Sequence, residues 1–214
     1  ALPGRGADCC GALHLHAGRI GEARGLARRV IASMPGDAAV VVDSAGCGAA
    51  MKEYGALLVT AEARAFSARV RDFSEWLVDQ PGPVLRDCGT QVVVQDPCHL
   101  RHVQHAHDAV RTVLAPAYRL MDTMDDGLCC GAGGAYAVFE PELSGAIRDR
   151  KVAALRAAGG DTPDHLIVVS ANPGCAMHLG AAGLDVRHPA QLIAQAMTPR
   201  PADSSRREQD DTDA

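Results

Sequence analysis

Apolar residues along this chain form two alternating patterns, which are short unbroken runs and longer stripes with helical spacing. The runs have the length of short strands and predict strands at 38–42, 91–95, 118–121 and 166–170. The stripes predict helices at 20–34, 61–79, 99–114, 141–158 and 189–197. Strands that alternate with helices indicate a mostly parallel sheet covered by helices, so the fold class we expect is α/β.

One arrangement occurs twice along the chain: a Cys-Cys-Gly motif, a helix, an apolar strand, and a glycine-containing turn that carries a third cysteine. The motif stands at 9–11 and again at 129–131, and the third cysteines are Cys47 and Cys175. The longer spacing in the second copy fits a longer helix and connection there. We therefore expect an internal duplication with two similar units. The expected divisions are a first unit at 1–85, a second unit at 86–197 and a disordered tail at 198–214.

The second copy has one further cysteine, Cys98, which comes directly after the strand predicted at 91–95. Its counterpart in the first copy would lie upstream of Ala1. The first unit is therefore expected to be N-terminally truncated. Because the chain does not begin with methionine, we expect it to be a fragment of a longer protein.

Composition excludes several classes of protein. The chain has 214 residues, of which 47% are hydrophobic, and a net charge of −5, which argues against a nucleic-acid partner. No apolar run approaches the ~20 residues of a membrane span, and no signal peptide is visible. We expect a cytoplasmic protein with no integral membrane segment, for which peripheral membrane association stays open. In that reducing compartment the eight cysteines favour metal ligation over disulfides.

The cysteine pattern predicts where the chemistry lies. In parallel sheets, ligands bind beyond the carboxyl ends of the strands. Four thiolates are expected to meet at this edge in the second unit, the number that a [4Fe–4S] cluster needs: Cys98, Cys129, Cys130 and Cys175. The first unit offers three in the same way: Cys9, Cys10 and Cys47. We expect an iron–sulfur cluster as the cofactor.

Other interpretations of these residues stay open. The cysteines could be small buried hydrophobes, although their repetition argues against this, or they could hold structural zinc in an assembly module without a redox role. Cys88 lies outside the repeat and is interpreted as a loop thiol. The histidines between His99 and His107 are interpreted as solvated helix residues, and the glycines at 131–134 as allowing close approach to a cluster.

At these residues the sequence resembles the cysteine-rich CCG-domain family. This family includes heterodisulfide reductase B subunits, lactate-utilisation iron–sulfur proteins and glycolate oxidase iron–sulfur subunits. The resemblance is strongest to the C-terminal region of the last group, through Cys9–Leu13, Gly46–Ala49 with Lys52–Gly55, and Asn172–Leu179. It implies Rossmann-like units and an electron-transfer role beside flavin-binding subunits that oxidise glycolate, with no catalytic residue on this chain.

Two departures from the family pattern matter. The heterodisulfide reductase pattern has a cysteine where this chain has Ser44 and Asn172, which argues against its five-cysteine clusters and disulfide chemistry. That activity, and a lactate-utilisation role, remain as alternatives. The family's glycolate oxidase subunits also carry an N-terminal ferredoxin-like domain, and this chain has no matching Cys-x-x-Cys-x-x-Cys run.

Overall fold

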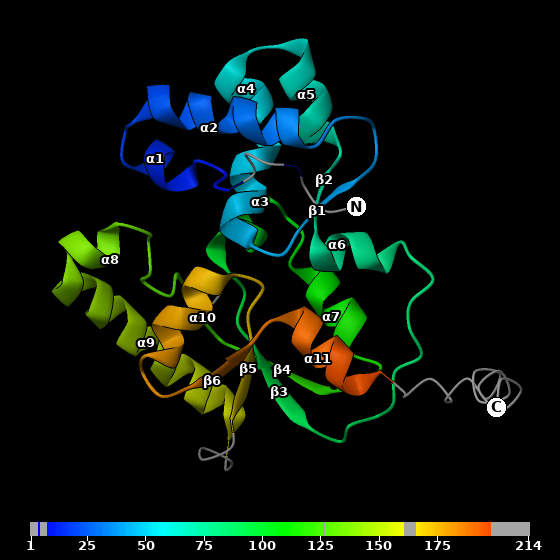
Figure 1. Cartoon of the computed structure of the whole chain (residues 1–214). Helices are drawn as coiled ribbons and strands as arrows, with labels where there is room; N and C mark the ends of the chain where they lie inside the picture. Colours follow the sequence, from blue (N-terminus) through cyan, green and yellow to red (C-terminus); the bar gives the residue numbers. More distant parts are fainter. Residues whose placement is uncertain (1–3, 5–7, 126, 161–165, 198–214) are drawn as a thin grey trace, which may run out of the picture.

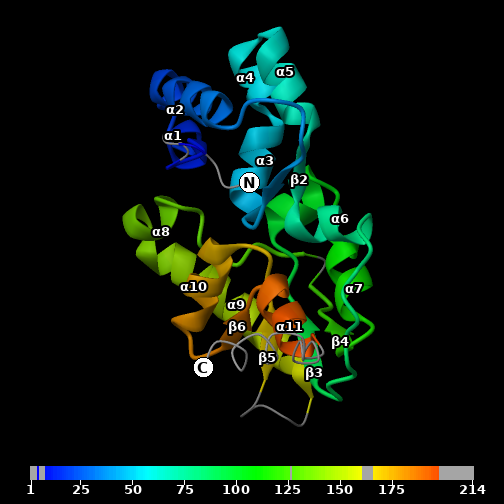
Figure 2. The same ribbon diagram turned by 45° about the vertical axis from the view of Figure 1, so that its right-hand side comes forward.

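The computed structural model describes residues 4, 8–125, 127–160 and 166–197, and it arranges them in two α/β units, one above the other (Figure 1). A turn of the molecule by 45° gives the same arrangement (Figure 2). All strand pairs within the two sheets are parallel, which confirms the predicted fold class. The expected tail at 198–214 lies outside the described residues.

The first unit is built on a two-stranded sheet in which β1 (Val40–Val42) pairs with β2 (Val70–Asp72). Its helices are α1 (Ala12–His16), α2 (Ile20–Ser33), α3 (Ala45–Lys52), α4 (Tyr54–Leu58), α5 (Ala61–Ala68) and α6 (Phe73–Val78). Helix α2 buries Ala23, Ala27, Val30 and Ile31 of its apolar stripe, the last three in one core with β1 and β2, whereas Ile20 at its start is exposed. The second unit begins with two strands, at Gln91–Val94 and Arg119–Asp122, that have no counterparts among the described residues of the first unit.

The second unit has a four-stranded sheet in the order β4-β3-β5-β6. Its strands are β3 (Gln91–Val94), β4 (Arg119–Asp122), β5 (Ile167–Val169) and β6 (Asp185–Arg187). Its helices are the π-helix η1 (His99–Val103), α7 (Asp108–Leu114), α8 (Tyr136–Phe139), α9 (Pro141–Gly159), α10 (Pro173–Gly180) and α11 (Pro189–Ala196). Alternate side chains of β3 enter cores on opposite faces: Val92 and Val94 pack with α7 and α11, and Val93 packs with α9 and α10.

The prediction of a single helix at 61–79 is wrong, because strand β2 separates helix α5 from helix α6 in this segment. Residues Val70–Asp72 pair with β1, and a capping box then starts α6, with Asp72 Oδ1 accepting from the Ser74 N–H at 2.9 Å. The apolar stripe serves two cores: Phe66 packs in the first unit, whereas Phe73 packs in the second.

The helix predicted at 99–114 is also interrupted. It begins as η1, breaks at residues 104–107 and resumes as α7. His105 has a φ of 54°, a left-handed conformation that ends a helix locally. In the part of the chain that the structure describes, no helix combines the length and apolar character that crossing a membrane needs.

Candidate functional site

The sheet order of the second unit places a ligand-binding position between β3 and β5. The chain passes from β3 to β4 on one side and then returns to β5 on the other, so the connections diverge between β3 and β5. Crevices at such switch points, beyond the carboxyl ends of the strands, are where open parallel sheets bind ligands. Cys98 follows β3 at this edge, and Cys175 lies in the first turn of α10 after β5.

The structure brings the four predicted cysteines of the second unit into one row of thiols. Cys130 donates to the Cys175 sulfur across 3.0 Å. Cys129 interacts with both Cys130 and Cys98, so the row runs Cys98–Cys129–Cys130–Cys175. Cys130 and Cys175 are buried, with exposed fractions of 2% and 4%, and the other two are partly exposed. Residues from three separate segments therefore present four soft ligand atoms at one place.

Hydrogen bonds divide these thiols into donors and acceptors. The pKa of Cys129 is lowered most by its interaction with Cys130 and next by its interaction with Cys98. The pKa of Cys175 is lowered by its bond from Cys130. The same bonds raise the pKa of Cys98 and Cys130. The Gly131 N–H also points at the Cys129 sulfur, at 3.4 Å. Thiolate character is thus favoured at Cys129 and Cys175, and thiolate is the form that binds metals.

The first unit repeats this geometry with three cysteines. The neighbouring Cys10 thiol, and to a smaller degree the Ser44 hydroxyl, lower the pKa of Cys47 to about 6 against the opposing effect of burial. The Gly11 N–H points at the Cys9 sulfur at 3.4 Å, the same distance as its counterpart at Gly131. The predicted pairing of a Cys-Cys motif with the cysteine of the later turn therefore occurs in both units.

Cys88 lies apart from both sites. It precedes β3, and its N–H donates to the Ala117 carbonyl just before β4, so it is at the opposite edge of the sheet. Its side chain packs against the core beside Tyr118. This position fits the interpretation of Cys88 as a loop thiol and makes it a suitable control.

The glycine of the second Cys-Cys-Gly motif has a packing role that the sequence did not reveal. Gly131 has a φ of 90°, and a Cβ there would lie 2.5 Å from the Ser144 carbonyl oxygen in α9. Ser144 Oγ donates to the Gly131 carbonyl at 2.9 Å, and His178 Nε2 lies 3.3 Å from the same hydroxyl. Contact with α9 therefore already demands a glycine at this position, and the close approach of the glycines to a cluster stays a prediction.

Gly131→Ala should destabilise the fold and reduce metal loading at the neighbouring cysteines. The methyl group would meet the α9 backbone, and alanine disfavours the left-handed conformation. Gly145→Ala is the control, since a Cβ at that position of α9 meets nothing within 4 Å. Urea unfolding should show a loss of stability for the first variant and a gain of up to about 1 kcal/mol for the second. Equal stability of the two variants would contradict this account.

Sequence reasoning missed three residues that contact the thiols or their surroundings. Asn172 Nδ2 donates to the Cys175 sulfur at 3.3 Å, and His99 Nδ1 lies 3.6 Å from the Cys98 sulfur. Lys151 is fully buried in α9, where it pairs with Asp125 at 2.7 Å and lowers the pKa of Cys175 by its charge. A lysine within an apolar helix stripe was the one signal in the sequence that could have indicated such a buried charge.

The chemistry of the donors fits an iron–sulfur cluster, because all four are sulfur, the ligand type that such clusters take. Four thiolates also suit structural zinc. In the described part of the chain, no three His, Cys, Asp or Glu side chains are grouped so that they could hold one metal ion.

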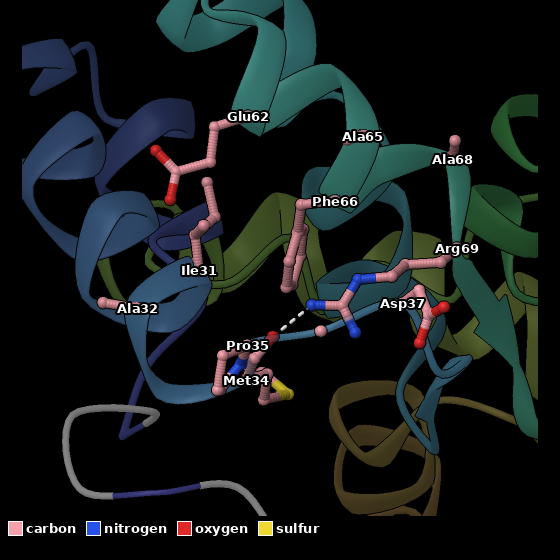
Figure 3. Close-up of a pocket in the computed structure, with 11 residues that line it drawn as sticks. Ile31, Ala32, Met34, Pro35, Asp37, Glu62, Ala65, Phe66, Ala68 and Arg69 are labelled. Carbon is pink, nitrogen blue, oxygen red and sulfur yellow. Dashed lines mark hydrogen bonds between the residues drawn. The ribbon is translucent and has the colours of Figure 1, made fainter.

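A surface cavity of about 530 Å³ lies away from the cysteines, between the end of α2 and helix α5 (Figure 3). Arg69 lines it, and its guanidinium donates to the carbonyls of Met34 and Ala38 and lies over the Phe66 ring at 4.9 Å. The Arg69 guanidinium is therefore already hydrogen-bonded to the main chain that follows α2. None of the predicted site residues lines this cavity.

The duplicated α/β units and their paired cysteine sites define a class of thiolate-rich, metal-binding α/β proteins. The model of the CCG cysteine-rich domain matches this chain twice, at residues 2–52 and 92–180. The chain therefore belongs to the CCG cysteine-rich domain family, and the two matched segments agree with the predicted duplication.

Comparison with curated proteins gives relatives within this family. The chain is 34% identical to the glycolate oxidase iron-sulfur subunit of Escherichia coli (strain K12), over 92% of this chain and 50% of the relative. It is also 34% identical to the probable glycolate oxidase iron-sulfur subunit of Bacillus subtilis (strain 168), over 80% of this chain and 40% of the relative. Lactate utilization protein A of Shouchella clausii (strain KSM-K16) is more distant, at 23% identity over 86% and 82% of the two chains. The chain spans half or less of the length of the first two relatives.

Proposed function

We propose that this chain is part of an iron–sulfur electron-transfer subunit in a complex that oxidises glycolate or a related 2-hydroxy acid. The observation that carries the proposal is the thiol row Cys98–Cys129–Cys130–Cys175 at the switch point of the sheet. The relatives at 34% identity, named as glycolate oxidase iron-sulfur subunits, support the same role. The four cysteines of the row are the proposed ligands, and [4Fe–4S] is the proposed cluster type.

A bound cluster would supply one-electron transfer at this position. The chain's own residues prepare the site for the negative charge that four thiolates bring. The Gly131 N–H and the Asn172 amide point at two of the sulfurs, and the buried Lys151 adds a positive charge nearby. Hydrogen bonds to the sulfurs, net charge and exposure are the properties that set the reduction potential of such a site.

The first unit is proposed as a second metal site, with Cys9, Cys10 and Cys47 as its ligands. It repeats the pairing of Cys10 with Cys47 and the bond from Gly11 to the Cys9 sulfur. Three cysteines leave one coordination position for a ligand from elsewhere, such as water, another chain or substrate. Analysis of iron per chain distinguishes one occupied site from two.

The flavin that accepts electrons from the 2-hydroxy acid is proposed to lie on a partner subunit. Eight free cysteines suit a reducing compartment, and the cytoplasm is our proposal for it. No catalytic residue is assigned to this chain.

Anaerobic reconstitution with iron and sulfide tests the proposal. We expect a broad absorbance near 400 nm that dithionite bleaches, with iron and acid-labile sulfide in equal amounts. A colourless protein that binds zinc stoichiometrically would instead identify an assembly module. Addition of the flavin partner should give glycolate-dependent reduction of an artificial acceptor, whereas reduction of disulfides without glycolate would favour the heterodisulfide-reductase-like alternative.

A further inference from the structure

Helices α3 and α10 begin in equivalent ways in the two units. Their N-cap residues are Ser44 and Asn172, which lie 128 residues apart, the interval that also separates Cys47 from Cys175. Serine and asparagine commonly cap a helix by accepting a hydrogen bond from one of its first N–H groups. Within these two helices, which the structure describes in full, neither side chain makes such a bond to its own helix. The first N–H groups of the helices therefore need other partners.

The second unit caps helix α3 of the first unit. Helix α3 lies between the other helices of the first unit and the second unit in both views (Figure 1 and Figure 2). The Ala45 N–H donates to the Ala171 carbonyl at 3.0 Å, and the Gly46 N–H donates to Asn172 Oδ1 at 3.1 Å. The Ser44 hydroxyl donates to the same oxygen at 3.3 Å. The turn that precedes α10 thus satisfies the first two N–H groups of α3.

These bonds fix the orientation of the Asn172 amide. A main-chain N–H group can only donate, so the amide oxygen must face Gly46, and the NH2 group then points to the other side. On that side Nδ2 donates to the Cys175 sulfur at 3.3 Å. One amide group therefore caps a helix of the first unit with its oxygen and donates to a cysteine of the second unit with its nitrogen.

We propose that Asn172 is a positioning residue through which the first unit directs a hydrogen-bond donor at the Cys175 sulfur. This inference rests on the proposed function, in which Cys175 is a cluster ligand. Without the bonds from Ser44 and Gly46, the Asn172 oxygen can turn to the N–H groups of its own helix α10, the ordinary arrangement for an N-cap asparagine. The NH2 group then leaves the sulfur. Docking of the first unit excludes this alternative, and it thereby holds a hydrogen bond that stabilises negative charge at the second site.

Hydrogen exchange of the reduced, metal-free chain tests the cap that Asn172 provides. Asn172→Ala removes the acceptor, so the Gly46 N–H should exchange about tenfold faster, as expected for the loss of a helix cap. Asn172→Asp keeps an oxygen at this position, where a helix N-terminus favours negative charge, and should restore the protection. The Ala45 N–H is the internal control, because its bond ends on a main-chain carbonyl that both variants keep. Unchanged exchange at Gly46 in Asn172→Ala would overturn the proposal.

Nuclear magnetic resonance of the same metal-free chain tests the other end of the amide. Cys175→Ala removes the acceptor of the Asn172 NH2 group and should shift its resonances, whereas Cys88→Ala, at the opposite edge of the sheet, should not. Ser44→Asp gives α3 a cap of its own and places a carboxylate beside the Asn172 oxygen, so it should turn the amide away from the sulfur. In that background Cys175→Ala should no longer shift the Asn172 resonances. An undiminished shift would show that the first unit does not direct the amide.

Reduction potentials test the effect on the loaded site. A hydrogen bond to a ligand sulfur stabilises the reduced, more negative state, so its loss lowers the potential. Asn172→Ala should lower the potential of the second site by about 59 mV, a tenfold change in the equilibrium for one electron. Iron at that site should be unchanged, because all four proposed ligands remain.

Gln104→Ala is the matched control. Gln104 Nε2 also joins the two units, by a bond to the Ala45 carbonyl at 2.8 Å, and this bond ends on the main chain. A purely structural role for the boundary predicts equal potential shifts in Gln104→Ala and Asn172→Ala. The positioning role predicts a shift only in Asn172→Ala.

The experiments separate the two proposals. If the wild-type chain binds no iron, the proposed function fails, and the two metal-free experiments still decide how the Asn172 amide is held. If the chain binds iron and Asn172→Ala has the potential of the wild type, the positioning role fails and the proposed function stands.

Discussion

Cys175→Ser will remove the iron of the second unit, whereas Cys88→Ser will leave the iron content unchanged. Cys175 is 4% exposed and 3.0 Å from the Cys130 sulfur, so its replacement removes one ligand from the interior end of the thiol row. A hydroxyl is a poor substitute for a thiolate toward iron in a sulfur-ligated cluster. Iron, acid-labile sulfide and absorbance near 400 nm, measured per chain after anaerobic reconstitution, give the result.

Serine is nearly isosteric with cysteine, so this change should leave the fold intact, and circular dichroism will verify that. Cys129→Ser should behave as Cys175→Ser does, because Cys129 interacts with two neighbouring thiols of the row. Cys47→Ser should remove only iron bound by the first unit. Equal iron in the Cys88, Cys129 and Cys175 variants would refute the ligand assignment.

The hydrophobic pattern predicts the secondary structure well where the apolar residues of a segment have one favourable environment. Strands β3 and β5 and helix α9 occur close to the expected ranges, because a buried valine run and a long amphipathic stripe each have one favourable environment. The pattern failed at 61–79, where the residues keep helical spacing although two of them pack in one unit and two in the other. Periodicity along the chain does not reveal which core a residue enters, and β2 forms because β1 provides its hydrogen-bond partner.

The site was predictable only in its sulfur atoms. Repeated motifs and strand ends were enough to bring together Cys98, Cys129, Cys130 and Cys175, because topology places the ends of parallel strands at one edge. The sequence marks Asn172 only as a position where the heterodisulfide reductase pattern has a cysteine, and its contact with Ser44 depends on how the two units meet. The domain division at residue 85 remains a prediction, and the packing of α6 against the second core adds a contact across it.

Lys151→Met should be the most destabilising single change outside the cysteines, at about 3–5 kcal/mol. The Lys151 side chain is 0% exposed and that of Asp125 is 9% exposed, with 2.7 Å between nitrogen and oxygen. Methionine fills a similar volume but leaves the Asp125 carboxylate buried without its cation. The loop before Cys129 is tied to α9 through this pair, so metal loading should fall as well. Urea unfolding of the metal-free chain at pH 7 measures the first effect, and iron after reconstitution measures the second.

Asp149→Asn is the control, because Asp149 in the same helix forms an exposed pair with Arg148, which contributes at most about 1 kcal/mol. The double variant Lys151→Met with Asp125→Asn should recover stability relative to Lys151→Met, since it removes the unpaired charge and keeps an acceptor for Thr123. A double variant no more stable than Lys151→Met would mean that lost packing, and not the unpaired carboxylate, causes the damage.

The pH dependence of Lys151→Met follows from the Asp125 carboxyl. Burial, the largest single influence, raises its pKa, but the bonds from Lys151, Thr123 and Gly127 and the charge of Lys151 together outweigh burial and lower the pKa below 3.8. A carboxyl with a lowered pKa in the folded state contributes stability above its unfolded pKa and loses it as pH falls through the folded pKa. Without Lys151, only the bonds from Thr123 and Gly127 oppose burial, so the pKa of Asp125 is higher in the folded variant than in the folded wild type. The stability difference between wild type and Lys151→Met should therefore shrink as pH falls toward and below 3.8, and a difference that is constant from pH 7 to pH 3 would show that the ion pair is not its source.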